Sequence, residues 1–331
     1  MTFSVHTFEL RLTPSTDEFS KLLKRAFEKS KGKHRLGKSN RHNGDDVRVD
    51  NALMEEGIKI EYHYDHYKKK VKFIVNPSRV LGGDDLKLWK PHDQNLREFI
   101  KELRDHIDDY FDSMYSLDDF ELKRIDFTIN IDVGSKENVT AYIKALQSIG
   151  RVKGFSPKYI KTDKHINRDQ SFDLEGNSNG IEFTIYDKVA ECEREKAAGI
   201  LRVEVRLKKS NAISRYTDKS NPAKQIRDLA KHSKEIFLDT FQRVVPPGDL
   251  YKKKRAVSII TESDFKQKMK DKMLTLLELI PTKKSLYLAQ KEMNDRNIAK
   301  VMQSFVDLDL SPVTLSKRHN KKHLKSLYKY L

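Results

Sequence analysis

The stretch RIDFTINIDV, residues 124–133, decides the fold, because it alternates as a β-strand does over ten residues. Two sets of residues alternate along it, an apolar set (Phe127, Ile129, Ile131, Val133) and a polar set (Asp126, Thr128, Asn130, Asp132). Strands of antiparallel sheets often pack one face on a core and keep the other polar. Aspartate and asparagine are depleted in strands, however, so this polar face calls for an explanation beyond strand propensity.

Two further stretches alternate in the same way, IEFTIYDK at 181–188 and ILRVEVRLK at 200–208. Their polar residues are Glu182, Thr184 and Tyr186 in the first, and Arg202, Glu204, Arg206 and Lys208 in the second. If the three strands share a sheet, carboxylates, a phenol and guanidinium groups share one surface. Composition alone also fits ordinary cross-strand ion pairs on a solvated face.

The rest of the N-terminal two thirds predicts alternating strands and helices. Strands are expected at 3–12, 57–65 and 69–76, helices at 15–30, 93–116, 137–147 and 187–198, a basic loop at 31–46, and irregular chain with one or two weak strands at 150–180. The order predicts an α+β fold, an antiparallel sheet with helices on one face. Its β-α-β-β-α series is compatible with two fused ferredoxin-like halves.

After Asn211 the pattern becomes helical. We expect helices at 221–244, 262–280, 284–292 and 294–307, with VVPPGDLYKKKR at 244–255 as a break. Short helices after Lys283 suit a helix-turn-helix or winged-helix-like module. The sequence therefore predicts an α+β domain over residues 1–215 and a basic helical region over 216–331.

Charge and composition indicate the partner and the compartment. The formal net charge is +16, and residues 209–331 hold 27 lysines and arginines against 13 aspartates and glutamates. Such asymmetry favours a polyanion, nucleic acid in particular, over a merely solvated basic surface. The sequence shows no secretory signal and no apolar run that could span a membrane, and its one cysteine is Cys192. We therefore expect a cytoplasmic protein without membrane contact.

The polar strand residues suggest a phosphoryl-transfer site. Carboxylates such as Asp126 and Glu204 suit Mg²⁺ or Mn²⁺, and the arginines on either side of Glu204 favour its ionised form. Tyr186 is a candidate nucleophile at a strand-to-helix junction. Because a phenol has a pKa near 10, it needs help from Lys188, the arginines or the metal.

The motifs resemble those of the trans-acting replication initiators of Gram-positive rolling-circle plasmids and related mobile-element relaxases. The family shows a strand like RIDFTINID, then a YDK…E segment, then a strand like RVEVRLK, here 124–132, 186–191 and 202–208. The resemblance covers residues 1–215, and its specificity lies in the order and spacing of the three motifs. Residues 1–215 would then form the nicking domain and 216–331 a DNA-binding region.

The resemblance implies that Tyr186 attacks a phosphodiester of origin DNA, forming a 5′-phosphotyrosyl link and leaving a 3′-OH primer. Lys188 and Arg202 would assist this catalytic tyrosine, and Asp126 and Glu204 would hold the metal. Asp132 is a third candidate ligand, although it comes later than in some members. Candidate contacts to DNA are Arg206, Lys208, Lys252, Lys253, Lys254 and Arg255. Duplex and single-stranded origin DNA is the implied partner, and a host helicase and a second copy are suggested ones.

Two other interpretations stay open on the sequence alone. A conjugative relaxase would use the same chemistry, and the residues do not separate it from a plasmid initiator. A non-enzymatic nucleic-acid-binding protein would use the sheet face and the basic helical region without any reaction. The set Tyr186, Asp126 and Glu204 discriminates, because only an enzyme needs the three together.

Overall fold

The computed structural model describes residues 3–29, 40–42, 45–64, 68–84, 86, 88–158, 170–192 and 195–331. Contacts within the chain define two compact units. The first unit comprises Thr2–Thr128 and Arg206–Ile236, and the second comprises Met1, Ile129–Val205 and Phe237–Leu331. The units therefore do not coincide with the predicted segments 1–215 and 216–331, since residues from both segments pack together in each unit. How function divides between those segments stays a prediction.

The first unit is built on an antiparallel sheet with the strand order β2-β3-β4-β5-β1-β6. Its strands are β1 (Ser4–Leu12), β2 (Asn40–His42), β3 (Asp45–Asp50), β4 (Ile58–Tyr64), β5 (Lys69–Val75) and the first part of β6 (Glu121–Asp132). Its helical segments are α1 (Thr16–Lys29), α2 (Pro77–Val80), α3 (Asp93–Phe111), η1 (Leu117–Asp119), α6 (Ser210–Ile213), α7 (Pro222–Lys231) and the start of α8 (Ser233–Val244).

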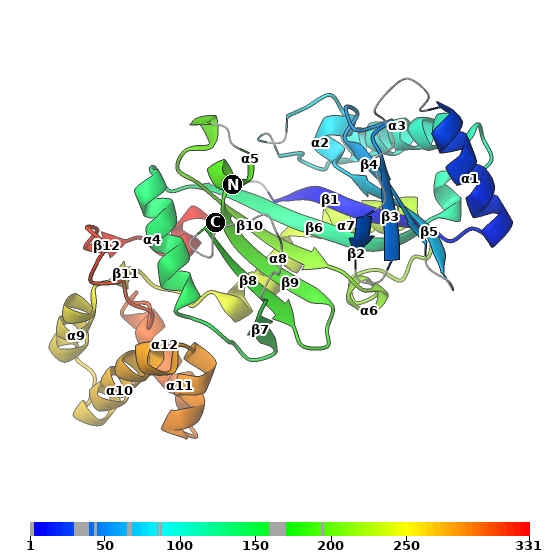
Figure 1. Ribbon diagram of the computed structural model, residues 1–331. Coiled ribbons are helices and arrows are strands. Elements are labelled where there is room, and N and C mark those ends of the chain that lie inside the picture. The colour runs from blue at the N-terminus through cyan, green and yellow to red at the C-terminus, as the bar shows by residue number, and fades with distance from the viewer. Residues whose placement is uncertain are drawn as a thin grey trace. The chain divides into compact units, whose positions relative to one another are not determined.

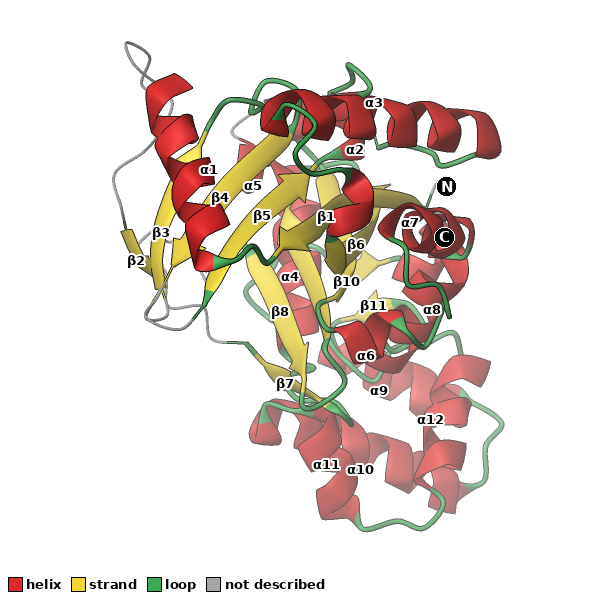
Figure 2. Ribbon diagram, turned by 90° about the vertical axis from the view of Figure 1, so that its right-hand side faces the viewer, coloured by secondary structure: helices red, strands yellow, loops and turns green. Residues whose placement is uncertain are grey.

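Helices α1 and α3 cover one face of this sheet (Figure 2). Aromatic rings carry the packing, because Phe19 of α1 meets Tyr62 of β4 and Phe99 of α3 meets Phe8 of β1. The chain runs β1-α1-β4-β5-α3-β6, and these four strands lie in the order β6-β1-β5-β4. This is the order of a ferredoxin-like half, as the strand and helix series suggests.

The second unit holds a sheet in the order β6-β10-β9-β8-β7 (Figure 1). Its elements are β7 (Phe155–Pro157), β8 (Ser171–Gly176), β9 (Ile181–Asp187), β10 (Ile200–Leu207), α4 (Lys136–Gln147), α5 (Lys188–Cys192) and η2 (Glu195–Ala197). Here β10 lies between β6 and β9, whereas a ferredoxin order begun at β6 would place β6 beside β9. The apolar face packs on α4 and on α8, where Phe241 meets Phe183.

The chain after α8 belongs to the second unit and is mostly helical, as predicted. It forms β11 (Leu250–Tyr251), α9 (Lys253–Glu262), α10 (Gln267–Lys283), α11 (Leu286–Met293), α12 (Ile298–Asp307), β12 (His323–Leu324) and η3 (Leu327–Tyr330). Helices α9 to α12 lie together, with α10 in contact with the other three (Figure 1). The start of α11 is fixed where the Leu286 N–H donates to the Ile149 carbonyl at 2.8 Å.

A buried carboxylate, Asp249, holds the C-terminal segment in place. Its oxygens accept from the Ser326 N–H and the Lys329 ammonium, both at 2.7 Å, and lie 2.8 Å from His323 Nε2. Burial by itself would raise the pKa of Asp249, but the bonds from Lys329, His323 and Ser326 outweigh it and lower that pKa. The anchor therefore keeps its negative charge at neutral pH.

Several predicted boundaries are wrong, for identifiable reasons. The expected loop at 31–46 contains β2 and the start of β3, because β3 gains backbone partners along β4; residues 30–39 and 43–44 lie outside the described part. The helix expected at 221–244 is two helices, separated at His232. Helix α9 begins inside the expected break, at Lys253, and the helix expected at 187–198 is only α5 and η2. By contrast, the one or two weak strands expected within 150–180 are present, as β7 and β8.

Over the described residues, no helix has both the length and the apolar character needed to cross a membrane.

Candidate active site

The polar face of β9 is set by its pairing with β8. Tyr186 lies opposite Ser171 and Thr184 lies opposite Asp173, so their side chains share one face of the sheet. On the other face, Ile181, Phe183 and Ile185 are fully buried. The predicted alternation of this strand is thereby confirmed. It leaves Tyr186, at the end of the strand, half-buried beside polar neighbours.

Tyr186 and Glu204 are joined directly. The tyrosine hydroxyl donates to Glu204 Oε1 at 2.7 Å, and the Glu204 side chain on β10 is 1% exposed. A buried carboxylate beside a half-buried phenol can accept its proton when the phenolic oxygen attacks. Strand alternation places these residues on one polar surface, and the second unit brings them into contact.

Lys188 follows at the start of α5. Asp187 caps this helix, since its Oδ1 accepts from the Val189 N–H at 3.0 Å, as expected for an N-cap. The Lys188 side chain is 1% exposed. No sequence signal indicates that this lysine is buried, because lysine is almost never fully buried unless it is paired. Its positive charge is thus held inside the second unit, two residues from Tyr186.

Arg202 is also fully buried, two residues before Glu204 on β10. Its Nε donates to Asn130 Oδ1 at 2.8 Å. Asparagine is rare in strands, and this hydrogen bond explains why it occurs here, because Asn130 orients the Arg202 guanidinium. From the sequence, Asn130 stood out only as an exception to strand propensity.

Asp126 lies in the first unit, on β6, and is 1% exposed. Arg124 binds both of its oxygens, with Nε 2.8 Å from Oδ1 and Nη2 in contact with Oδ2. Arg206 is a second cation beside it, with Nε 3.6 Å from Oδ2. The sequence analysis did not predict that Arg124 binds Asp126, although its position two residues before Asp126 places both side chains on one strand face.

Asp132 differs from the other candidate ligands because it is exposed. Its Oδ1 accepts from the Gly134 N–H at 2.8 Å and thereby shapes the turn that ends β6. Another acidic residue of the polar face, Glu182, is buried and pairs with Lys158 at 2.7 Å. The alternation that places Glu182 on the same strand face as Tyr186 was the sequence signal that could have identified it as a candidate site residue.

The donor chemistry at Asp126 and Glu204 fits Mg²⁺ or Mn²⁺, which prefer carboxylate oxygens and often take one or two of them with waters and substrate phosphates. Within the described ranges, no group of three or more His, Cys, Asp or Glu side chains is arranged to hold a metal. Arg124 donates to both oxygens of Asp126, so a metal ion that binds there must share these oxygens with the guanidinium or displace it.

The candidate DNA contacts fall in two places. Arg206 is half-buried against Asp126, whereas Lys208 at the end of β10 is exposed. The run 252–255 forms the N-terminus of α9, with Lys252 as N-cap and the other three residues in the first turn. Lys254 and Arg255 are exposed there. Cations at the positive end of a helix dipole repel one another, and a phosphate would relieve that repulsion.

Comparison with known proteins gives one family match. A family model that describes the N-terminal part of a phage replication-associated protein matches residues 51–220, a span that contains all the predicted catalytic and metal-binding residues. No curated protein matches the chain.

Two solved structures align distantly. A rolling circle replication initiator protein from Geobacillus stearothermophilus aligns with 11% identity and a TM-score of 0.34, over 73% of this chain and 85% of that one. DynU16, from the dynemicin biosynthetic locus, aligns with 11% identity and a TM-score of 0.19, over 72% of this chain and 98% of that one. Similarities of this size carry no weight for function.

Proposed function

Because the chain belongs to the family of phage replication-associated proteins whose N-terminal model it matches, we propose that it initiates rolling-circle replication by nicking one strand of origin DNA. The family membership agrees with the resemblance to replication initiators. The observation that carries the proposal is the 2.7 Å hydrogen bond from the Tyr186 hydroxyl to Glu204. A nucleophile with its proton acceptor already in contact is what covalent catalysis by a weak nucleophile requires.

In the proposed reaction the Tyr186 oxygen attacks the phosphorus of one phosphodiester. Its proton passes to Glu204 Oε1, the bond from phosphorus to the 3′-oxygen breaks, and a tyrosyl ester to the 5′-phosphate forms. The 3′-oxygen takes up a proton and leaves as the 3′-OH that primes synthesis. One phosphodiester replaces another, so the step needs no ATP.

Two buried cations support this chemistry. Arg202 and Lys188 are buried in the same unit as Tyr186, and buried positive charge would stabilise the negative charge that develops on a phosphate in the transition state. Asn130 would keep the Arg202 guanidinium in one orientation, which avoids the cost of reorganising it during the reaction.

We propose that acidic residues of the polar strand faces are ligands of a divalent metal ion. Asp126 in the first unit, and Glu204 and Asp132 in the second, are the candidate ligands for Mg²⁺ or Mn²⁺, which when bound would supply neutralising charge to the phosphate oxygens. A carboxylate has two oxygens, so Glu204 can serve both the tyrosine and a cation.

The experiment is incubation of the protein with supercoiled plasmid carrying its own origin, in Mg²⁺, in Mn²⁺ and in EDTA. We expect relaxed plasmid and a protein–DNA adduct that survives SDS in either metal, and neither product in EDTA. Equal relaxation in EDTA would refute the metal requirement. Origin binding without any adduct would favour the non-enzymatic binding protein. Synthesis from the new 3′-OH in a cell-free replication assay separates an initiator from a conjugative relaxase.

For duplex binding we propose the cations at the start of α9. A helix N-terminus with exposed basic residues suits a phosphate, and phosphate contacts provide affinity that falls as salt rises. Exposed Lys208 and half-buried Arg206 are proposed as further contacts to DNA. Origin DNA is then the main partner, a host helicase and a second copy are proposed further ones, and the cytoplasm is the expected compartment.

Replacing Lys253 and Lys254 together by alanine should weaken binding of a 30-base-pair origin duplex at every salt concentration. If both contact phosphates, the slope of log affinity against log salt falls by about 0.9 for each lost contact. Fluorescence anisotropy across a salt series measures this slope. Lys101→Ala, on an exposed lysine of α3, is the control and should leave the slope unchanged. An unchanged slope in the double variant would remove α9 from the interface.

A further inference from the structure

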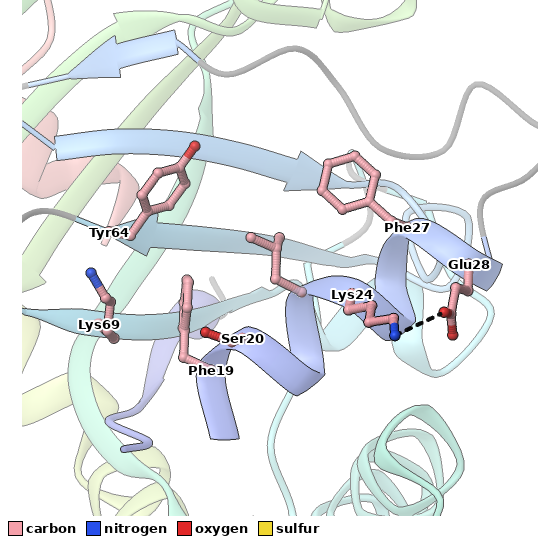
Figure 3. A pocket seen from close by; sticks show the side chains of 8 residues that line it. Phe19, Ser20, Lys24, Phe27, Glu28, Tyr64 and Lys69 are labelled. Atoms are coloured by element: carbon pink, nitrogen blue, oxygen red, sulfur yellow. Dashed lines mark ion pairs between the residues drawn. The ribbon is translucent and has the colours of Figure 1, made fainter. Parts of the chain in front are cut away.

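A hollow of about 750 Å³ opens in the first unit between α1 and the adjoining ends of β4 and β5 (Figure 3). Phe19, Leu23 and Phe27 line it from α1, Tyr64 from the end of β4 and Lys69 from the start of β5. Its surface is mostly carbon, and its volume is within the range of pockets that bind small aromatic molecules. The hollow belongs to the first unit, whereas Tyr186 belongs to the second.

Aromatic rings in this hollow are open to an incoming ligand. Phe27 is 40% exposed, one of four large apolar side chains in the described ranges with this much exposure. Tyr64 is half-buried, and its ring lies 6.1 Å from that of Phe19. The hollow therefore offers aromatic surface to a flat apolar group.

Cations accompany these rings. The Arg48 guanidinium lies over the Phe27 ring, 4.8 Å from its centroid, and its Nε donates to the Tyr64 hydroxyl at 3.4 Å. Lys24 and Lys69 also line the hollow, although Glu28 lines it too. Rings bordered by positive charge suit a ligand that joins an aromatic face to an anion.

We propose that this hollow stacks an unpaired base of single-stranded DNA while Lys24, Lys69 and Arg48 contact the neighbouring phosphates. Proteins that hold single strands combine stacking rings with a positive groove, and bases in duplex DNA do not expose their faces. Lys24 is paired with Glu28 at 3.9 Å, so the charge offered to a ligand comes mainly from Lys69 and Arg48, and an uncharged apolar peptide would gain nothing from it. The proposal rests on the proposed function, because the implied nicking substrate is single-stranded or extruded origin DNA.

The test uses the full chain and a 5′-fluorescein-labelled dT12 oligonucleotide in anisotropy titrations. Phe27→Ala should weaken binding about fivefold to a hundredfold, which corresponds to the loss of one stacked base, and Tyr64→Ala should do the same. Tyr64→Phe keeps the ring and should bind within about twofold of wild type. Val306→Ala, at an exposed apolar residue of α12, is the matched control and should change nothing.

Three results would overturn the proposal. The first is a Phe27→Ala variant that melts at the wild-type temperature and binds dT12 as tightly as the wild type does. The second is an equal loss of affinity for a 30-base-pair duplex, which would mean a general electrostatic effect. The third is unchanged dT12 binding together with lost binding of the uncharged apolar dye Nile red, which would mark a surface for apolar peptides.

The outcome is independent of the nicking assay. If wild type forms no adduct on its origin but Phe27→Ala weakens dT12 binding, the proposed function fails and the stacking site stands. If the adduct forms and Phe27→Ala binds dT12 normally, the function stands and the stacking site fails.

Discussion

Tyr186→Phe is expected to abolish nicking of origin plasmid, by at least about 10³-fold, because it removes the only atom that attacks phosphorus in the proposed reaction. The ring stays in place, so binding of origin duplex should stay within about twofold of wild type. Relaxation of supercoiled plasmid measures the reaction, and anisotropy measures the binding.

The matched control for this variant is Tyr142→Phe. Tyr142 is a buried tyrosine of α4 in the same unit, and its hydroxyl donates to the Lys325 carbonyl at 2.7 Å. Both variants remove a hydrogen bond made by a tyrosine hydroxyl, which costs about 0.5–3 kcal/mol of stability. Thermal melting should therefore fall in both, but nicking should survive in Tyr142→Phe. Loss of nicking in both variants to the same degree would mean that stability, and not chemistry, explains the effect.

Glu204→Gln is expected to lower the nicking rate about 10²- to 10⁴-fold at neutral pH. Glutamine has the shape of glutamate and can still accept the Tyr186 hydrogen bond, but it cannot take up the proton. The deficit should shrink as pH rises toward the phenol pKa near 10, because an ionised tyrosine needs no base. Single-turnover adduct formation from pH 6 to pH 10 measures this.

Glu175→Gln is the control for that variant. Glu175 is an exposed carboxylate of β8, and its register partner on β9 is Glu182. It should nick at the wild-type rate. A Glu204→Gln deficit that excess Mn²⁺ removes and high pH does not would assign Glu204 to the metal alone and refute its role as base.

Alternation along the strands predicted the sheet that carries the candidate active site well, because burial on one face fixes which side chains share the other. It placed Tyr186 and Glu204 on one surface, and they are hydrogen-bonded. It did not reveal that Lys188 and Arg202 are buried, since burial of a charge depends on partners from distant segments, such as Asn130 for Arg202. Nor did it show that Arg124 is hydrogen-bonded to Asp126, because strand spacing indicates that two side chains are close but not that they pair.

Local composition was least informative where pairing between strands decides the structure. The segment that forms β3 is polar and follows a glycine and an asparagine, so its composition predicts a loop, but it is a strand because it pairs with β4. The hollow between α1 and the ends of β4 and β5 could not be predicted from the sequence either. Phe19 and Phe27 belong to one apolar helix stripe, and only the fold shows that Phe19 is buried while Phe27 stays exposed beside Arg48.

The most direct measurement is the identity of the residue that becomes attached to DNA. Wild-type protein is incubated with Mn²⁺ and a single-stranded oligonucleotide spanning its origin nick site, and the adduct is digested with protease and nuclease and sequenced by mass spectrometry. We expect a nucleotide on the peptide that contains Tyr186, bonded through its 5′-phosphate. A nucleotide bonded to any other residue, with Tyr186 unmodified, would contradict the proposed reaction.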